Sequence, residues 1–199
     1  MRSDKGQHLP RVAHLLGHLV SCVVLTGCVV LSNPEYPSEW ASLQSNYQNC
    51  RHIAGTYKNA GERVREGNWG SSFDSLSQLL GRYKAWPTAT RPDRVRIAFA
   101  GDETLTTEAW EGNRLVASIR FSANTDDFHC VDASIEFTRS EVVAEQVAGM
   151  QSETIRISKA SDGSLVLKYS TAGFGLIGGI LPAGGNGRSW SRFAPMDPH

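Results

Sequence analysis

The feature that most limits the fold of this 199-residue chain is a series of alternating segments that begins after Pro92. Apolar side chains occupy every second position in each segment, which is the period of a half-buried β-strand. The segments cover residues 94–99, 105–110, 115–121, 131–137, 155–157 and 165–169, and Trp190 and Phe193 mark a last strand. Residues 139–150 fit either a strand extension or a packed loop. The chain is therefore expected to be mainly β.

Short turn sequences separate these segments. Gly101 precedes Asp102, Gly112 precedes Asn113, and Asp162 with Gly163 gives the clearest tight hairpin signal. Strands joined this closely, without helices between them, favour an antiparallel meander over a parallel sheet. About eight strands would fit, and that number permits a barrel or half-barrel with an apolar interior. Closure would remove the exposed edges that a meander otherwise has to protect.

One or two short helices are expected before these strands. Ser38 can cap the first, whose helically spaced apolar residues are Trp40, Leu43 and Tyr47. Ser72 can cap the second, whose apolar face consists of Phe73, Leu76, Leu79 and Leu80. Gly81 follows at the position where a left-handed residue commonly ends a helix.

An apolar run from Leu15 to Leu25 follows a cationic start and leads into Thr26, Gly27 and Cys28. This order is typical of a secretory signal, and the run is short of the roughly 20 apolar residues that a membrane-spanning helix needs. The residues Leu25–Cys28 resemble the lipobox of bacterial lipoproteins. The resemblance implies that residues 1–27 are a removed signal peptide and that Cys28 carries diacylglycerol and further acyl chains such as palmitate. An ordinary secretory signal with an incidental Cys28 is the alternative.

The same resemblance predicts the organisation of the mature chain. Residues 28–38 contain Pro34 and Pro37 and suit a lipidated tether, and residues 39–199 are long enough for a single β-rich domain. Val29 follows the cysteine, where Asp would favour the inner membrane in that family, so a periplasm-facing place at the outer membrane is expected. Without residues 1–27 the formal charge is about −2, which gives no reason to expect nucleic-acid binding.

Cys50 and Cys130 remain as a pair in this expected mature chain. In an oxidising compartment such a pair is most simply a disulfide, which would close a loop of about 80 residues. His52 and His129 stand beside the two cysteines, so a zinc site is the alternative. Both half-sites have tighter spacings than the usual structural zinc pattern, which favours the disulfide.

A short strand is expected from Ile53, and it contains Gly55, Thr56 and Tyr57. These three residues resemble the Gly-x-Trp opening of lipocalin-type barrels, with Tyr in the place of Trp. The resemblance implies that Arg188 or Arg192 packs over the Tyr57 ring. A simple core aromatic is the alternative role for Tyr57.

Residues 172–187 interleave glycines with large apolar side chains, so the segment is apolar yet conformationally loose. As a loop it could touch a membrane, close over a cavity or dock a partner. Its candidate ligand or partner residues are Phe174, Leu176, Ile177, Ile180 and Leu181. The alternative is a strand that continues from Tyr169 through Leu176, followed by a glycine-rich turn at Pro182.

Few residues support catalysis, because only His52 and His129 of the expected mature chain could act as internal general bases. The sequence has no nucleophile elbow and no metalloprotease motif, and apart from the zinc alternative to the disulfide nothing in it indicates a metal or a cofactor. An enzyme is therefore not expected. The favoured interpretation is a lipid-anchored envelope protein of structural or partner-interaction type, with a membrane and an envelope protein as its contacts. The alternative is a lipocalin-like module that binds an apolar or amphiphilic molecule.

Overall fold

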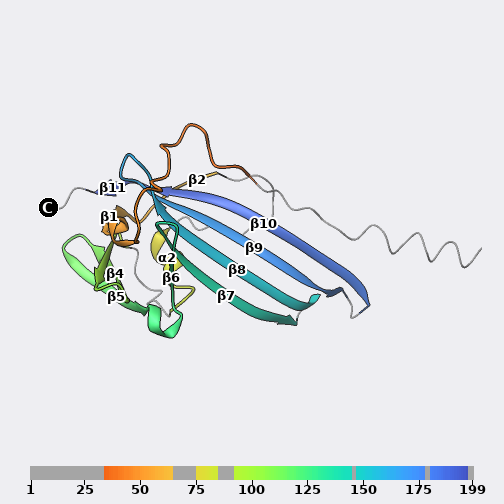
Figure 1. Ribbon diagram of the computed structural model, residues 1–199. Coiled ribbons are helices and arrows are strands. Elements are labelled where there is room, and N and C mark those ends of the chain that lie inside the picture. The colour runs from red at the N-terminus through yellow and green to blue at the C-terminus, as the bar shows by residue number, and fades with distance from the viewer. Residues whose placement is uncertain (1–33, 65–74, 85–91, 145–146, 178–179, 197–199) are drawn as a thin grey trace, which may run out of the picture.

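The computed structural model describes residues 34–64, 75–84, 92–144, 147–177 and 180–196, and it is mainly β (Figure 1). The side chains of Val64, Val143, Ala144, Val147, Ile177, Leu181 and Pro182 are outside the description. The strands form two antiparallel sheets, one five-stranded and one six-stranded. Residues 1–27 and Cys28 lie outside the described residues, so the signal peptide and its lipidation site remain predictions.

The five-stranded sheet has the order β11-β1-β3-β4-β5. Its strands are β1 (Gly55–Lys58), β3 (Arg94–Ala100), β4 (Thr104–Glu111), β5 (Arg114–Ser122) and β11 (Pro195–Met196). Gly101 and Gly112 have φ angles of 70° and 56° in the turns of the central meander. These left-handed positions suit glycine, so the strands and turns expected over residues 94–121 are confirmed.

The six-stranded sheet has the order β2-β10-β9-β8-β7-β6. Its strands are β2 (Glu62–Val64), β6 (His129–Val131), β7 (Ser134–Ala144), β8 (Val147–Lys159), β9 (Leu165–Ile177) and β10 (Leu181–Phe193). The hairpin expected at Asp162 and Gly163 joins β8 to β9. There Gly163 has a φ of 84°, and the amide of Ser164 donates to Oδ1 of Asp162 at 3.0 Å.

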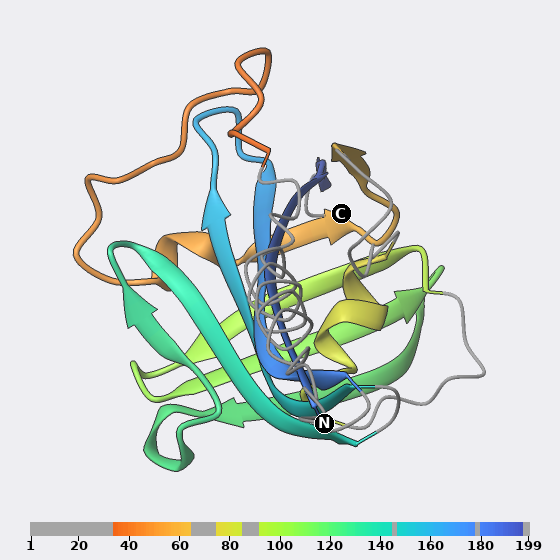
Figure 2. The ribbon, with the colours of Figure 1, turned by 90° about the vertical axis from the view of Figure 1, so that its right-hand side faces the viewer.

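The main core combines both sheets with the helix α2 (Leu76–Leu80) and the 3₁₀ turn η1 (Arg51–Ile53). A second 3₁₀ turn, η2 (Ala123–Thr125), follows β5. Figure 2 shows α2 in the angle between the sheets. The largest fully buried side chains are aromatic and include Tyr57, Phe121, Phe137, Tyr169 and Phe193. Burial of such side chains is the main force that holds the two sheets together.

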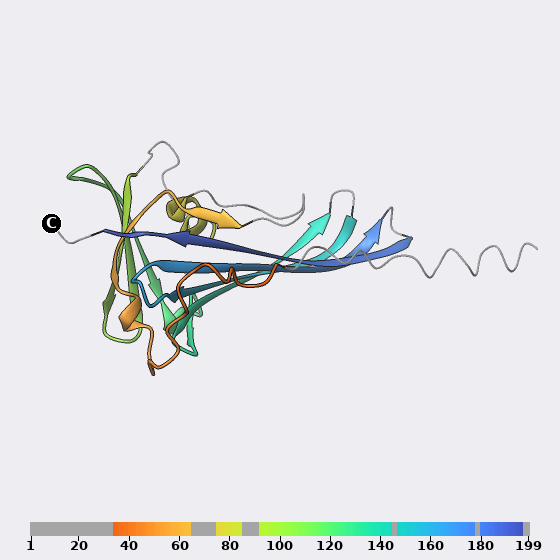
Figure 3. The ribbon, with the colours of Figure 1, turned by 90° about the horizontal axis from the view of Figure 1, so that it is seen from above.

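The strands β7 to β10 run past the five-stranded sheet, which they cross at a steep angle (Figures 1 and 3). We call their far part the blade. It consists of residues 138–144, 147–154, 170–177 and 181–188. α2 and the segment that begins at Pro34 lie on opposite sides of the six-stranded sheet (Figure 3). We call the α2 side of the blade its inner face and the other side its outer face.

Four expectations about the strands and their turns are corrected. The described strands form two separate sheets and no closed barrel, because no ladder joins an edge of one sheet to an edge of the other. The strand expected over residues 131–137 is divided by a turn in which Asp132 and Ala133 have φ angles of 46° and 60°. The glycine-rich residues 172–177 and 181–187 are paired strands and not a loop, so the strand expected from Tyr169 through Leu176 is confirmed. The turn expected at Pro182 is wrong, because Pro182 pairs with Leu176 inside β10.

The expectations about helices also change. The helix expected over Trp40–Tyr47 is wrong, because Leu43 instead forms a β-bridge with Ala160 and Trp40 packs in a small cluster with Trp190. The other expected helix exists as α2 with Ser75 as its cap, whereas Ser72 and Phe73 lie outside the described residues. Gly81 has a φ of −64°, so the expected left-handed end is also wrong, and the chain continues into a further turn.

Candidate functional site

The disulfide between Cys50 and Cys130 is confirmed. Their Cα atoms lie 5.8 Å apart, and the bond joins residues separated by 80 positions. It links the segment before β1 to the edge strand β6. Two sulfurs bonded to each other are not thiolate ligands, so the zinc alternative is wrong. Among the described residues, no cluster of His, Cys, Asp and Glu is arranged to hold a metal ion.

The residues that resemble a lipocalin opening have a structural role in this fold. Tyr57 is fully buried, and its hydroxyl donates to the carbonyl oxygen of Ile53 at 2.5 Å. Burial raises its pKa strongly, since the phenolate would lose its hydration. Arg192 lies near the end of β10 that is outside the blade, and it pairs with Asp162 at 2.5 Å. Tyr57 is therefore a core aromatic with a satisfied hydroxyl.

The two histidines considered as bases have different surroundings. His52 stacks on Tyr47 with ring centroids 4.1 Å apart, and its Nδ1 lies 2.9 Å from the carbonyl oxygen of Asn49. Burial and nearby Lys159 lower the pKa of His52, although the contact with Asn49 opposes them. His129 lies on the exposed edge strand β6. The stacked ring of His52 has the features of a packing contact.

The register of the blade places exposed apolar side chains from adjacent strands in one row. Val142 pairs with Met150, Met150 pairs with Phe174, and Phe174 pairs with Gly184. Because alternate residues of a strand share a face, Leu176 lies on the same face as Phe174. Core residues such as Tyr169 occupy the opposite parity in β9, so this row belongs to the outer face.

Solvent exposure of this end of the blade is high. The exposed fractions are 77% for Val142, 66% for Met150, 67% for Phe174, 38% for Leu176 and 81% for Ile180. Large apolar side chains gathered in this way commonly mark an interaction site. We call these five residues the apolar tip.

The structure thus brings together three of the residues singled out from the sequence, namely Phe174, Leu176 and Ile180. The side chains of Ile177 and Leu181 lie outside the described residues. Sequence reasoning missed Val142 and Met150, because their place beside Phe174 depends on the pairing between strands. The alternation of Val142 with Glu141 is the sequence signal that could have indicated them.

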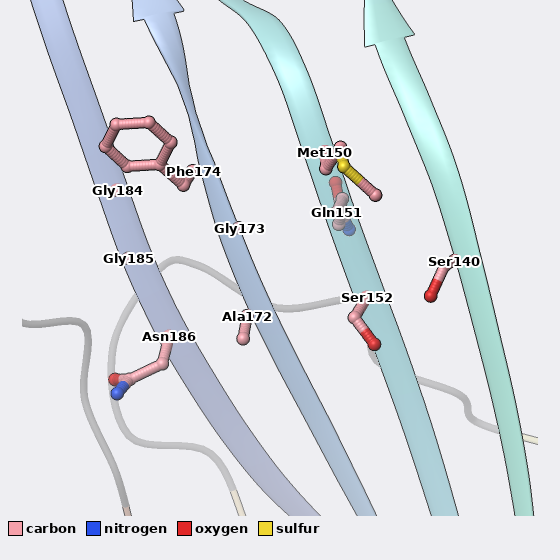
Figure 4. A pocket seen from close by; sticks show the side chains of 10 residues that line it. All are labelled: Ser140, Met150, Gln151, Ser152, Ala172, Gly173, Phe174, Gly184, Gly185 and Asn186. Atoms are coloured by element: carbon pink, nitrogen blue, oxygen red, sulfur yellow. The ribbon is translucent and has the colours of Figure 1, made fainter.

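Behind the apolar tip the outer face is hollowed. A depression of about 540 Å³ crosses the four strands. It is lined by Ser140, Met150, Gln151, Ser152, Ala172, Gly173, Phe174, Gly184, Gly185 and Asn186 (Figure 4). A second depression of about 220 Å³ continues it toward Thr154, Ser170 and Arg188. Small side chains leave this space, since glycine, alanine and serine fill little volume above a sheet.

Basic side chains follow on the same face, closer to the core. Arg188 pairs with Ser170, and one row further on Lys168 pairs with Arg156 and with Trp190. Nζ of Lys168 lies 5.7 Å from the centre of the Trp190 ring. Burial lowers the pKa of Lys168, and the positive charges of Arg188 and Arg156 lower it further, against the effect of Glu136. Arg156 also pairs with Asp132 at 3.1 Å.

A buried carboxylate marks the junction between the core and the inner face of the blade. Glu153 is almost fully buried, and its Oε1 accepts a hydrogen bond from the hydroxyl of Tyr169 at 2.9 Å. The same oxygen lies 3.3 Å from Arg82, which follows α2. A buried carboxylate with these partners stabilises the fold only while the partners are present. This cluster holds the base of the blade against α2.

The helices in the described part of the chain are short, and none has both the length and the hydropathy needed to span a bilayer. Comparisons of the chain with protein-family models, with curated proteins and with solved structures found no match. The function therefore has to be argued from the residues of this chain.

Proposed function

We propose that this chain is a lipid-anchored envelope protein of interaction type, held at the outer membrane through Cys28 and facing the periplasm. Its working surface is the apolar tip of the blade. The observation that carries this proposal is the exposure of Val142, Met150, Phe174 and Ile180 at the projecting end of one sheet. Such side chains are costly to leave in water, so a surface that presents them together indicates a contact.

The position of the first described residues supports the anchor. The carbonyl oxygen of Pro34 accepts a hydrogen bond from Nε1 of Trp190 at 3.0 Å, so the chain reaches the domain on the outer face. The Cys50–Cys130 disulfide supports an oxidising compartment, because such bonds form and persist there. Both observations agree with a mature chain that begins at Cys28 and enters the periplasm.

The lipocalin-like alternative has less support. Aromatic side chains from both sheets fill the main core, which leaves little room for a ligand between them. The two depressions of the blade open on its outer face and do not lead into this core. An apolar or amphiphilic molecule bound there would lie against the sheet and would not be enclosed.

Mass spectrometry of the amino-terminal peptide tests the anchor. The full chain, produced in a bacterium with an outer membrane, should yield a peptide that begins at Cys28 and carries diacylglycerol. Cys28→Ser should abolish the modification, whereas Cys22→Ser, a matched change within the predicted signal peptide, should leave it intact. An unmodified peptide that begins at another residue would contradict the anchor.

Fractionation tests the location. The lipidated chain should sediment with outer-membrane vesicles and should be digested by protease only after the periplasm is opened. A chain that is released with the soluble periplasmic proteins would contradict the proposal.

A further inference from the structure

We propose that the apolar tip inserts into the surface of a phospholipid bilayer that carries anionic headgroups, with the blade tilted so that its far end enters first and its outer face is turned toward the bilayer. This inference rests on the proposed function for the lipid anchor at Cys28. It goes further by naming the occupant of the apolar tip. Three observations lead to a membrane: the depth of the apolar rows, the charge of the outer face and the length of the tether.

The apolar part of the outer face has the depth of a membrane interface. Phe174 and Leu176 are two residues apart on β9, so their rows are separated by about 7 Å. Ile180 extends the apolar surface beyond them at the end of the β9–β10 hairpin. Interfacial segments bury their apolar face to about 5–10 Å, whereas the hydrocarbon core is about 30 Å thick. The apolar tip therefore fits shallow insertion.

In the part of the chain that the structure describes, no carboxylate lies on the outer face close to the apolar tip. Among the described residues, the outer row that contains Phe174 and the next two rows toward the core consist of Val142, Met150, Phe174, Gly184, Ser140, Ser152, Ala172, Asn186, Thr138, Thr154, Ser170 and Arg188. Lys168 and Arg156 follow in the next row, together with Glu136. Asp132 lies beside Arg156, on the side away from the apolar tip.

Among the side chains that the structure describes, the positive charge of Arg188 is therefore the first charge behind the apolar residues of the outer face. Each lysine or arginine near an anionic lipid surface contributes about 1 kcal/mol of attraction. A bilayer with anionic headgroups offers both the apolar layer and the negative charge that this face requires. The same order of apolar and then basic side chains is typical of segments that lie in the membrane interface.

The tether has the length needed to bring the anchor and the apolar tip to one bilayer. The roughly six residues from Cys28 to Pro34 reach about 20 Å when extended. Pro34 is held at Trp190, and the stretch of β10 from Trp190 to Gly184, which pairs with Phe174, also spans about 20 Å. An acylated Cys28 can therefore enter the same leaflet that Phe174 contacts.

Photo-cross-linking in living cells tests this contact with the full chain. Position 174 receives p-benzoylphenylalanine in place of Phe174, and position 150 receives it in place of Met150 as a second probe. The matched control replaces Leu115, an exposed leucine on β5 in the other sheet. After irradiation we expect phospholipid adducts at positions 174 and 150 and none at position 115. The disulfide and the thermal unfolding of each variant verify that the fold is retained.

Discrete cross-linked protein bands at positions 174 and 150, without lipid adducts, would overturn the inference. Those bands would assign the apolar tip to a second copy of the chain or to another envelope protein. The mass of the amino-terminal peptide is measured by mass spectrometry in the same samples, to determine whether Cys28 is acylated. Loss of lipid at Cys28 would contradict the proposed anchor, whereas an intact anchor without lipid adducts at the apolar tip would contradict only the membrane contact.

Reconstitution into vesicles tests the headgroup charge. Adduct yield at position 174 is compared between phosphatidylcholine alone and an equimolar mixture with phosphatidylglycerol. We expect a higher yield with the anionic lipid, and Arg188→Gln or Lys168→Gln should lower that yield about fivefold. Arg96→Gln removes an exposed charge from β3 in the other sheet and serves as the control. Equal yields on both lipids would overturn the requirement for anionic headgroups.

Discussion

The carbonyl oxygen of Pro34 accepts a hydrogen bond from Nε1 of Trp190 at 3.0 Å, which fixes the start of the described chain on the outer face of β10. The ring of Tyr36 meets the same indole edge-to-face, with centroids 5.2 Å apart. Trp40 completes this cluster in the place where a helix was expected. The segment that precedes the domain is therefore part of the fold from Pro34 onward.

Trp190→Phe should loosen this segment while it keeps most of the ring packing. The lost hydrogen bond should reduce the free energy of unfolding by about 1 kcal/mol, since the buried Pro34 carbonyl would lose its indole donor. Urea unfolding measures the change, and hydrogen exchange should show faster exchange in residues 36–41. Trp110→Phe on β4 is the control, and equal effects of the two changes would contradict the role of the Pro34 contact.

The strands were predictable because their alternation reflects a purely local property, the two faces of a sheet. The turns at Gly101, Gly112 and Gly163 were predictable for a related reason, since glycine readily adopts positive φ. The sheet order was not predictable in this way. β1 pairs with β11 and β2 pairs with β10, and both ladders join residues more than half the chain apart.

Tertiary packing also overrode two local signals. The spacing of Trp40 and Leu43 suits a helix, but Leu43 pairs with Ala160 and Trp40 packs against the sheet. The glycines of residues 173–187 weaken a strand in isolation, yet ladders on both sides of β9 hold it extended. For the same reason the apolar tip was only partly predictable, because Val142 and Met150 lie beside Phe174 only through the pairing of the strands.

The Cys50–Cys130 disulfide should contribute about 3–5 kcal/mol to the free energy of unfolding, since it closes a long loop. The double variant Cys50→Ala with Cys130→Ala should lose this amount in urea unfolding. A reductant should lower the stability of the parent chain by a similar amount and should leave the variant unchanged. A double variant as stable as the parent would show that the disulfide contributes little to the free energy of unfolding.

Gly149 allows β8 and β9 to approach closely within the blade. A Cβ atom at this position would lie 2.2 Å from the carbonyl oxygen of Phe174, so Gly149→Ala forces the backbone apart. We expect a loss of about 1–3 kcal/mol and faster amide exchange in the far ends of both strands. Gly173→Ala is the matched control, because its nearest atom would lie at an ordinary 3.5 Å. Similar losses of unfolding free energy in both variants would contradict the role of the close approach between Gly149 and the Phe174 carbonyl.

His52 should make the stability of the fold depend on pH in the acidic range. Burial lowers its pKa below the ordinary value of 6.5, helped by Lys159 and opposed by the Asn49 carbonyl, so the folded state prefers the neutral ring. Below about pH 6.5 the unfolded chain binds a proton that the folded chain still resists, and the free energy of unfolding therefore falls as the pH falls. Urea unfolding across this range should show a smaller slope for His52→Gln than for the parent. The control His129→Gln changes the exposed histidine of β6 and should keep the pH dependence of the free energy of unfolding that the parent shows. The same pH dependence in His52→Gln would show that other groups cause it.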